Sequence, residues 1–379
     1  MGLLDRHIFK NVFMTCLGAV GFFTFIMTAG NALKDLIGHF LAGRMSLGTT
    51  LRLLFWLLPY AVTYALPMGI LCGVLLVLGR MSAENEVTAM RAAGLSLLRI
   101  ARPIYVFGAV AMICALIVNL EIMPQARAQY KQELVNVVRT DPKLLLVPKT
   151  FIREFRNMVV YVGERHGDAL KDVWVWRLDS ESRVINCLKA QSGRIQFDDS
   201  DNSLVFTAQD AVMETRDEKA PESFKEMPRV GPYESSSLKF PLEKLFGRQM
   251  VSTRAEWLTF SVLRAEIAKR ETPVPGGDEA ERVARLTKLR MVLQDKLAMG
   301  VAVLTFVFVA VPLGIKVSRR ETTANLGVAV ILALSYYFIS VVVKWLDGYP
   351  QIRPDLWLWL PNVIFVSLGI WLMRRVQRA

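Results

Sequence analysis

Six long apolar runs organise the chain, three in its first third and three at its end. Each is long enough to cross about 30 Å of hydrocarbon as a helix. The runs cover residues 8–29, 53–78, 103–120, 297–315, 326–343 and 356–373. This pattern predicts an α-helical membrane protein with six transmembrane helices and with both termini on one side of the bilayer.

A more polar stretch, residues 121–296, separates the third run from the fourth. In short segments such as 172–178 and 203–207, hydrophobic and polar residues alternate as in strands, and Asp, Ser, Asn and Gly residues lie between the segments. Helical spacing returns at 258–270 and 279–296. We therefore predict an inserted β-jelly-roll-like domain that ends in helices.

These patterns divide the chain into three parts. Residues 1–120 hold transmembrane helices one to three, with a loop at 79–102 between the second and the third. Residues 121–296 form the inserted β-rich domain, and residues 297–379 hold transmembrane helices four to six.

The distribution of charge orients the predicted helices. The chain is 53% hydrophobic and carries a formal net charge of +12, and its basic excess lies at the two ends and in two of the loops. The residues are Arg6, Lys10, Arg80, Arg91, Arg99, Arg102, Lys316, Arg319, Arg320, Arg374, Arg375 and Arg378. By the positive-inside rule, both termini are cytoplasmic and the inserted domain is periplasmic in a bacterial inner membrane.

Motifs for enzymatic chemistry are missing from the sequence. It contains no GxxxxGK[ST], HExxH or GxSxG pattern, and its four Cys and three His residues have no zinc spacing. The centres of the apolar runs lack charged residues, which argues against an ion-driven carrier. We expect a non-enzyme without catalytic residues, metal site, cofactor or nucleic-acid partner, whose energy comes from another protein.

The loop at 79–102 mixes acidic, basic and small residues next to the membrane. Glu84 and Glu86 precede Arg91 and Gly94 in a segment rich in helix formers. One interpretation is a coupling helix that docks into a groove of a cytoplasmic ATPase, where its acids pair with basic residues. The other is an ordinary solvated loop beside the membrane.

Several segments resemble the LptF/LptG family, the permeases of the lipopolysaccharide-export transporter. The resemblance lies in residues 66–70 (Leu-Pro-Met-Gly-Ile), in residues 78–96, which hold the Glu-Asn-Glu sequence, and in residues 4–8, 293–298 and 311–315. It covers both membrane halves, whereas the insertion agrees in position and β character. The start of the chain, residues 4–8, resembles LptG slightly more, and the loop at 79–102 resembles both members of the family.

The resemblance implies a permease subunit of an ABC transporter that extracts lipopolysaccharide from the inner membrane and passes it to a periplasmic bridge. Its implied partners are a paralogous permease in an LptF–LptG heterodimer, an LptB-like ATPase dimer that uses ATP and Mg, LptC/LptA-like bridge proteins, lipopolysaccharide and membrane lipids. Glu84 is then expected to contact the ATPase. The alternative is a non-transporting membrane scaffold or mechanotransmission subunit with a periplasmic interaction domain.

The resemblance also implies lateral gates for lipid at the first and fifth spans. We expect lipid contacts from aromatic side chains on these spans and from basic side chains near the outer ends of spans: Phe25, Lys34, Arg127, Lys131, Tyr336 and Phe338. The alternative is that such residues only anchor or pack the helices. Trp174 and Trp176, on one face of a predicted strand, either line a groove for a partner strand or belong to the domain core.

Overall fold

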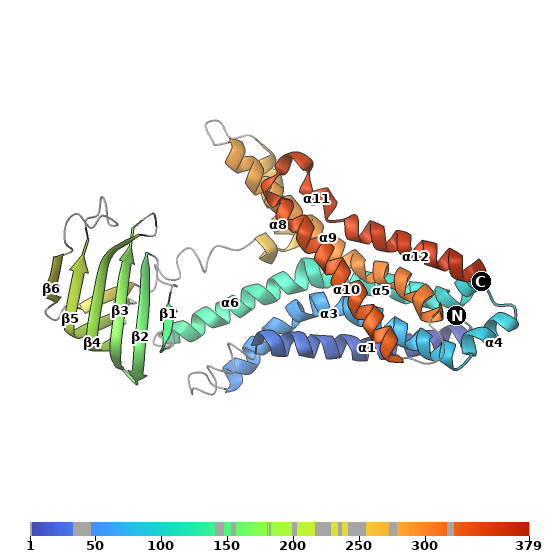
Figure 1. Cartoon of the computed structure of the whole chain (residues 1–379), viewed down its shortest axis with the longest axis horizontal. Coiled ribbons are helices and arrows are strands. Elements are labelled where there is room, and N and C mark those ends of the chain that lie inside the picture. The colour runs from blue at the N-terminus through green and yellow to red at the C-terminus, as the bar shows by residue number, and fades with distance from the viewer. Residues whose placement is uncertain are drawn as a thin grey trace. The chain divides into compact units, whose positions relative to one another are not determined.

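The computed structural model contains a helical unit and a separate sheet (Figure 1). The helical unit comprises Met1–Tyr130 and Arg254–Ala379, and the sheet unit comprises Lys131–Thr253. The structure describes residues 2–32, 47–140, 148–152, 157–179, 181, 183–198, 203–216, 229–233, 237–241, 255–272, 279–316 and 322–378.

Six stretches of helix are long and apolar enough to cross a membrane. They extend over Leu3–Gly30, Leu47–Ala83, Leu97–Glu133, Glu281–Ile315, Gly327–Gly348 and Pro354–Arg378. The six predicted spans are thus confirmed by helix length and composition. The helices that form them are α1 (Leu3–Ala32), α3 (Leu47–Ala83), α5 (Leu97–Ile117), α9 (Glu279–Lys316), α10 (Thr322–Lys344) and α12 (Leu360–Arg378).

Helices α3 and α9 form the centre of the helical unit. Most residues in their apolar parts are buried, whereas most residues of α1 and α10 are not. The buried core joins α1, α3, α5, α9 and α10, and α12 contributes Phe365 and Met373. Because α1 and α10 bury little of their apolar surface within this chain, they leave wide apolar faces uncovered.

Glycines let the backbones of α1 and α3 approach closely. Gly69 and Gly73 have the GxxxG spacing that favours close helix contacts in membranes. A Cβ atom at Gly69 would lie 2.7 Å from the backbone N and Cα of Val20, and one at Gly73 would lie 2.7 Å from the Cα of Cys16. The two glycines are therefore required by the helix packing.

The third span continues well beyond its apolar run. Helix α5 passes through a π-helical segment, η2 (Val118–Ile122), into α6 (Met123–Thr140). On the return path, α8 (Phe260–Glu271) packs against α9 through Leu263, Ile267 and Leu289. The two compact units divide at Tyr130 and Arg254, whereas the predicted bounds at 121 and 296 follow the ends of the apolar runs. Hydrophobicity marks where the hydrocarbon ends, and these helices extend past it.

The sheet unit is antiparallel, and its described strands pair in chain order from β1 to β5. Both β6 and β7 pair with β5, each along a different part of it. Ala211 of β5 pairs with Tyr233 of β6, and Thr207 of β5 pairs with Ser237 of β7, so the two short strands follow one another along the same edge of β5. The predicted β character is confirmed, and closure into a jelly-roll stays a prediction. The strands are β1 (Thr150–Ile152), β2 (Met158–His166), β3 (Ala169–Leu178), β4 (Val184–Asp198), β5 (Ser203–Thr215), β6 (Arg229–Tyr233) and β7 (Ser237–Pro241).

The two faces of the sheet differ in burial. Val173 and Val175 of β3 belong to the buried cluster of this unit, whereas Trp174 and Trp176 point to the opposite face. There the two indole rings stack with centroids 5.7 Å apart. The tryptophans are therefore outside the buried cluster, and their contact with a partner strand stays a prediction.

Candidate functional site

A short helix, α4 (Glu86–Ala92), occupies the loop between the second and third spans. It follows α3 after Asn85, whose backbone is left-handed with φ 60°. It ends at Ala92, and the chain turns at Gly94, with φ +85°, where the Leu95 N–H donates to the Met90 carbonyl at 3.1 Å. This αL glycine is the usual way to end a helix. Val87, only 4% exposed, fixes α4 to the core.

The charged residues of this segment have no partners within the described chain. Glu84 and Arg91 are exposed and Glu86 is partly exposed, and none of the three forms an ion pair with another described residue. The Ser82 hydroxyl donates to the Ile315 carbonyl at 3.1 Å, which ties the end of α3 to the end of α9. The segment is thus fixed to the bundle while its charges remain available.

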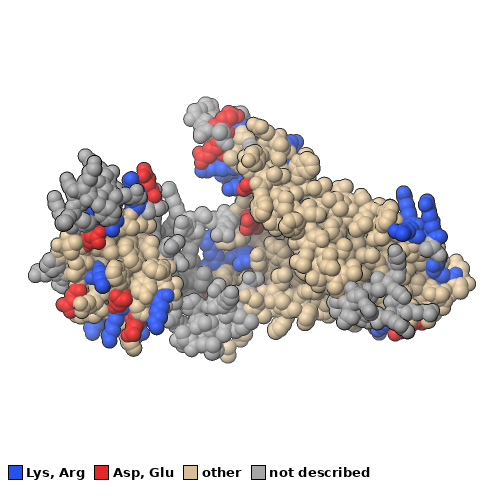
Figure 2. All heavy atoms as spheres, in the orientation of Figure 1, with Lys and Arg blue, Asp and Glu red and all other residues tan. Residues whose placement is uncertain are grey.

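The chain termini lie at the same end of the helical unit as α4 (Figure 1). Arg99 of α5 bonds Asp5 of α1 there, with 3.2 Å between Nη2 and Oδ2. Figure 2 shows Lys and Arg side chains at both ends of this unit and a wide surface without charge between them. This division is what a bundle that crosses hydrocarbon requires.

The aromatic residues expected at the lateral gates do not all face outward. Phe25 of α1 and Phe338 of α10 are 71% and 69% exposed, whereas Tyr336 is only 1% exposed. The Tyr336 ring packs edge-on against Phe306, with centroids 5.0 Å apart. The expectation that Tyr336 faces acyl chains is therefore corrected. Two positions along a helix rotate a side chain by about 200°, so residues 336 and 338 lie on opposite faces.

Of the three basic residues expected to contact lipid, two lie on α6 and the third lies outside the described residues. The Arg127 guanidinium of α6 lies 3.8 Å from the centroid of the Tyr60 ring, a cation–π contact. Lys131 is four residues further along α6, on the same side of that helix. Lys34 lies outside the described residues.

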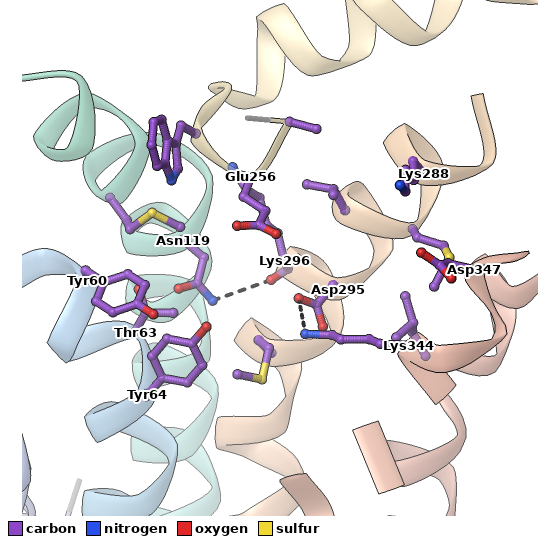
Figure 3. A pocket seen from close by; sticks show the side chains of 17 residues that line it. Tyr60, Thr63, Tyr64, Asn119, Glu256, Lys288, Asp295, Lys296, Lys344 and Asp347 are labelled. Carbon is purple, nitrogen blue, oxygen red and sulfur yellow. Dashed lines mark hydrogen bonds and ion pairs between the residues drawn. The ribbon is translucent and has the colours of Figure 1, made fainter. Parts of the chain in front are cut away.

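A cavity of about 580 Å³ lies among the helix ends that are remote from α4 (Figure 3). Besides the spans, three short elements border it, namely η4 (Ala255–Trp257), η5 (Trp345–Gly348) and the turn after α11 (Pro354–Trp357). Its lining residues are Tyr60, Thr63, Tyr64, Asn119, Met123, Ala255, Glu256, Trp257, Lys288, Met291, Val292, Asp295, Lys296, Met299, Lys344, Asp347 and Leu358.

Polar contacts across this cavity join separate elements. Lys344 Nζ of α10 lies 2.8 Å from Asp295 Oδ2 of α9. Lys296 is 6% exposed, and its Nζ donates to the Leu258 carbonyl at 2.6 Å. Asn119 Nδ2 donates to the Lys296 carbonyl at 3.5 Å (Figure 3). The cavity wall is therefore held by contacts between the third, fourth and fifth spans.

Comparison with known proteins decides the family. A family model described as "Lipopolysaccharide export system permease LptF/LptG" matches residues 6–375. The chain belongs to this family. It is similar to the lipopolysaccharide export system permease protein LptF of Escherichia coli K12 and of Shigella flexneri, at 20% identity over 345 residues in both cases. Each match covers 89% of this chain and 86% of the relative.

An LptF/LptG permease is a multi-pass inner-membrane protein and the permease component of lipopolysaccharide export, not the ATPase. These curated relatives are named LptF, whereas the resemblance at residues 4–8 slightly favoured LptG. At 20% identity the similarity places the chain in the family without choosing between its two members.

The polar cavity of this LptF/LptG permease was not predicted from the sequence. Asp295 and Lys296 directly precede the fourth apolar run, and Lys344 directly follows the fifth. Charged residues commonly flank a transmembrane helix, so these three residues alone did not indicate a binding site. Glu256 and Lys288 come from polar segments far apart in sequence, and only the folded chain brings them to one cavity.

Lys296→Met removes the bond that ties residues 255–259 to α9. Because this hydrogen bond has a charged donor and is worth about 1.5 kcal/mol or more, amide exchange in that segment should become at least roughly tenfold faster. Hydrogen–deuterium exchange with mass spectrometry measures the change. Lys288→Met, in the same cavity but without that bond, is the matched control. Equal exchange in both variants would contradict the assigned role of Lys296.

Proposed function

We propose that this LptF/LptG permease is the membrane subunit of an ABC transporter that extracts lipopolysaccharide from the inner membrane for a periplasmic bridge. The observation that carries the proposal is the turn after α3 together with α4: Glu84 in the turn, and Glu86 and Arg91 in the helix, form no ion pair with another described residue. A groove with basic residues on a cytoplasmic ATPase complements the two acids. That LptB-like ATPase binds the ATP and Mg, and this chain needs no cofactor.

The uncovered faces of α1 and α10 support a second permease as a partner. Phe25 and Phe338 lie on these faces, which are too apolar for water. In an LptF–LptG heterodimer, α1 of one permease lies near α10 of the other. Lipopolysaccharide enters between them, so these two helices form the gates and the two phenylalanines contact acyl chains.

The orientation follows from the basic residues around α4. With both termini and α4 in the cytoplasm, the sheet unit is periplasmic. Its described edge strands, β1 on one side and β6 with β7 on the other, offer backbone groups to an added strand. We propose that a jelly-roll built on this sheet joins LptC/LptA-like bridge proteins in this way.

Basic side chains on the periplasmic side suit the phosphates of the glycolipid. Arg127 Nε is buried and has no hydrogen-bond partner among the described residues, and Lys131 follows on the same side of α6. A guanidinium binds phosphate oxygens in a fixed geometry, whereas an ammonium acts as a point charge. We propose that Arg127, Lys131 and Lys34 contact lipopolysaccharide.

Co-purification with the cytoplasmic ATPase tests the docking role of residues 84–92, which comprise the turn after α3 and α4. Glu84→Ala should weaken capture of the ATPase, and Glu84→Lys should abolish it because the variant places like charges together. Glu164→Lys, on an exposed position of β2, makes the same charge change in the sheet unit and should leave capture unchanged. Full capture by Glu84→Lys would contradict the proposed docking surface.

A further inference from the structure

We propose that the cavity at the helix ends remote from α4 binds a phosphoethanolamine group, which is a phosphate joined by a short spacer to a primary ammonium. The cavity is the 580 Å³ space lined by α3, η2, η4, α9 and the end of α10. This site goes beyond the export function, since it lies inside one chain and not between two permeases.

The position of the cavity suits the headgroup of a lipid. Lys296 directly precedes the apolar run 297–315, and Lys344 directly follows the run 326–343, so both mark the edge of the hydrocarbon. Met123, Met291 and Met299 add an apolar wall next to the charged one. Such a mixed lining accepts the polar head and the first carbons of an amphiphile.

Charges of both signs line the cavity in equal number. Its lysines are Lys288, Lys296 and Lys344, and its acids are Glu256, Asp295 and Asp347. Lys344 and Asp295 pair with each other.

Both signs of charge remain available after that pairing. Lys288, Glu256 and Asp347 form no ion pair with any described residue, and Figure 3 shows them around one space. A purely anionic head would meet the unpaired acids, and a purely cationic head would meet the unpaired Lys288 ammonium. A zwitterion offers a partner to each and lowers the cost of removing them from water.

Asn119 favours a primary ammonium over the quaternary ammonium of choline. Its side chain is 2% exposed and lines the cavity, and its Oδ1 has no hydrogen-bond partner among the described residues. It lies in η2, and π-helical segments of this kind are frequent at functional sites. A buried acceptor needs a donor. A primary ammonium supplies N–H donors, whereas the quaternary ammonium of choline supplies none.

Native mass spectrometry of the full-length chain tests the proposal. The chain, purified in detergent, is incubated with phosphatidylethanolamine, phosphatidylglycerol or phosphatidylcholine of equal acyl composition, and the retained lipid is counted. Phosphatidylethanolamine should be retained at least roughly tenfold better than the other two, as expected for one additional hydrogen bond from a charged donor. Equal retention of phosphatidylglycerol or phosphatidylcholine would overturn the proposal.

Variants locate the bound lipid. Glu256→Gln and Lys288→Gln change exposed side chains of the cavity, so both should fold and each should reduce retention roughly tenfold. Lys269→Gln, exposed on α8 outside the cavity, should retain the wild-type amount. Unchanged retention in both cavity variants would place the lipid elsewhere and refute the site. The mass of lipid that co-purifies without addition distinguishes a bilayer phospholipid from a glycolipid that bears phosphoethanolamine.

Discussion

Gly69→Ala and Gly73→Ala should destabilise the helical unit by about 2 kcal/mol each, because a single methyl group at either position overlaps the backbone of α1. The clash is with the N and Cα atoms of Val20 and with the Cα of Cys16. A backbone cannot move aside as a flexible side chain does, so the two helices must separate. The lost contact joins the first span to the centre of the bundle.

Two glycines of α1 provide matched controls. A Cβ atom at Gly18 or Gly21 would meet nothing within 4 Å in this chain. Since alanine is the better helix former by up to about 1 kcal/mol, Gly18→Ala and Gly21→Ala should keep or raise stability. Thermal unfolding in detergent measures all four variants. A Gly69→Ala protein as stable as Gly18→Ala would show that α1 and α3 are not in close contact.

Asn362→Ala should cost about 2 kcal/mol, because it removes the centre of a buried hydrogen-bond network. Asn362 Oδ1 accepts from the hydroxyls of Thr305 at 2.9 Å and Tyr336 at 3.3 Å. Its Nδ2 donates to the Ala298 carbonyl at 3.0 Å. The network joins α9, α10 and α12, and its members Thr305, Tyr336 and Asn362 are all buried.

Ser335→Ala is the control for the loss of a polar group in the same region. Its hydroxyl is exposed and donates only to the Ile331 carbonyl of its own helix at 2.7 Å. The change should stay within about 0.5 kcal/mol. Thermal unfolding of both variants in one detergent makes the comparison. Equal stability of the two variants would refute the structural role of the Asn362 network.

Much of the fold follows from the spacing of apolar residues. The six spans are visible in the sequence as apolar runs long enough to cross the bilayer, and the β-rich insertion is visible as alternation of hydrophobic and polar residues. The limits of the two units are not visible there. Helices α6 and α8 are too polar to register as spans, yet packing assigns α8 and the start of α6 to the helical unit.

From the sequence, a candidate site could be proposed only where its residues are neighbours in the chain. Glu84, Glu86, Arg91 and Gly94 form one continuous segment, and the structure places a short helix there. Tyr336 was misplaced because a cluster of aromatics in sequence does not share one face of a helix. The cavity joins residues from 60 to 358, and such long-range contacts leave no local pattern.

ATP-dependent release of lipopolysaccharide from proteoliposomes tests the central claim most directly. The permease is reconstituted with a partner permease, the ATPase and a bridge protein, and wild type is compared with Glu84→Lys and with the control Glu164→Lys. The export account predicts release by wild type and by the control, and none by Glu84→Lys. A stable wild-type complex that hydrolyses ATP and releases no lipopolysaccharide would contradict it and would favour a scaffold that transports nothing.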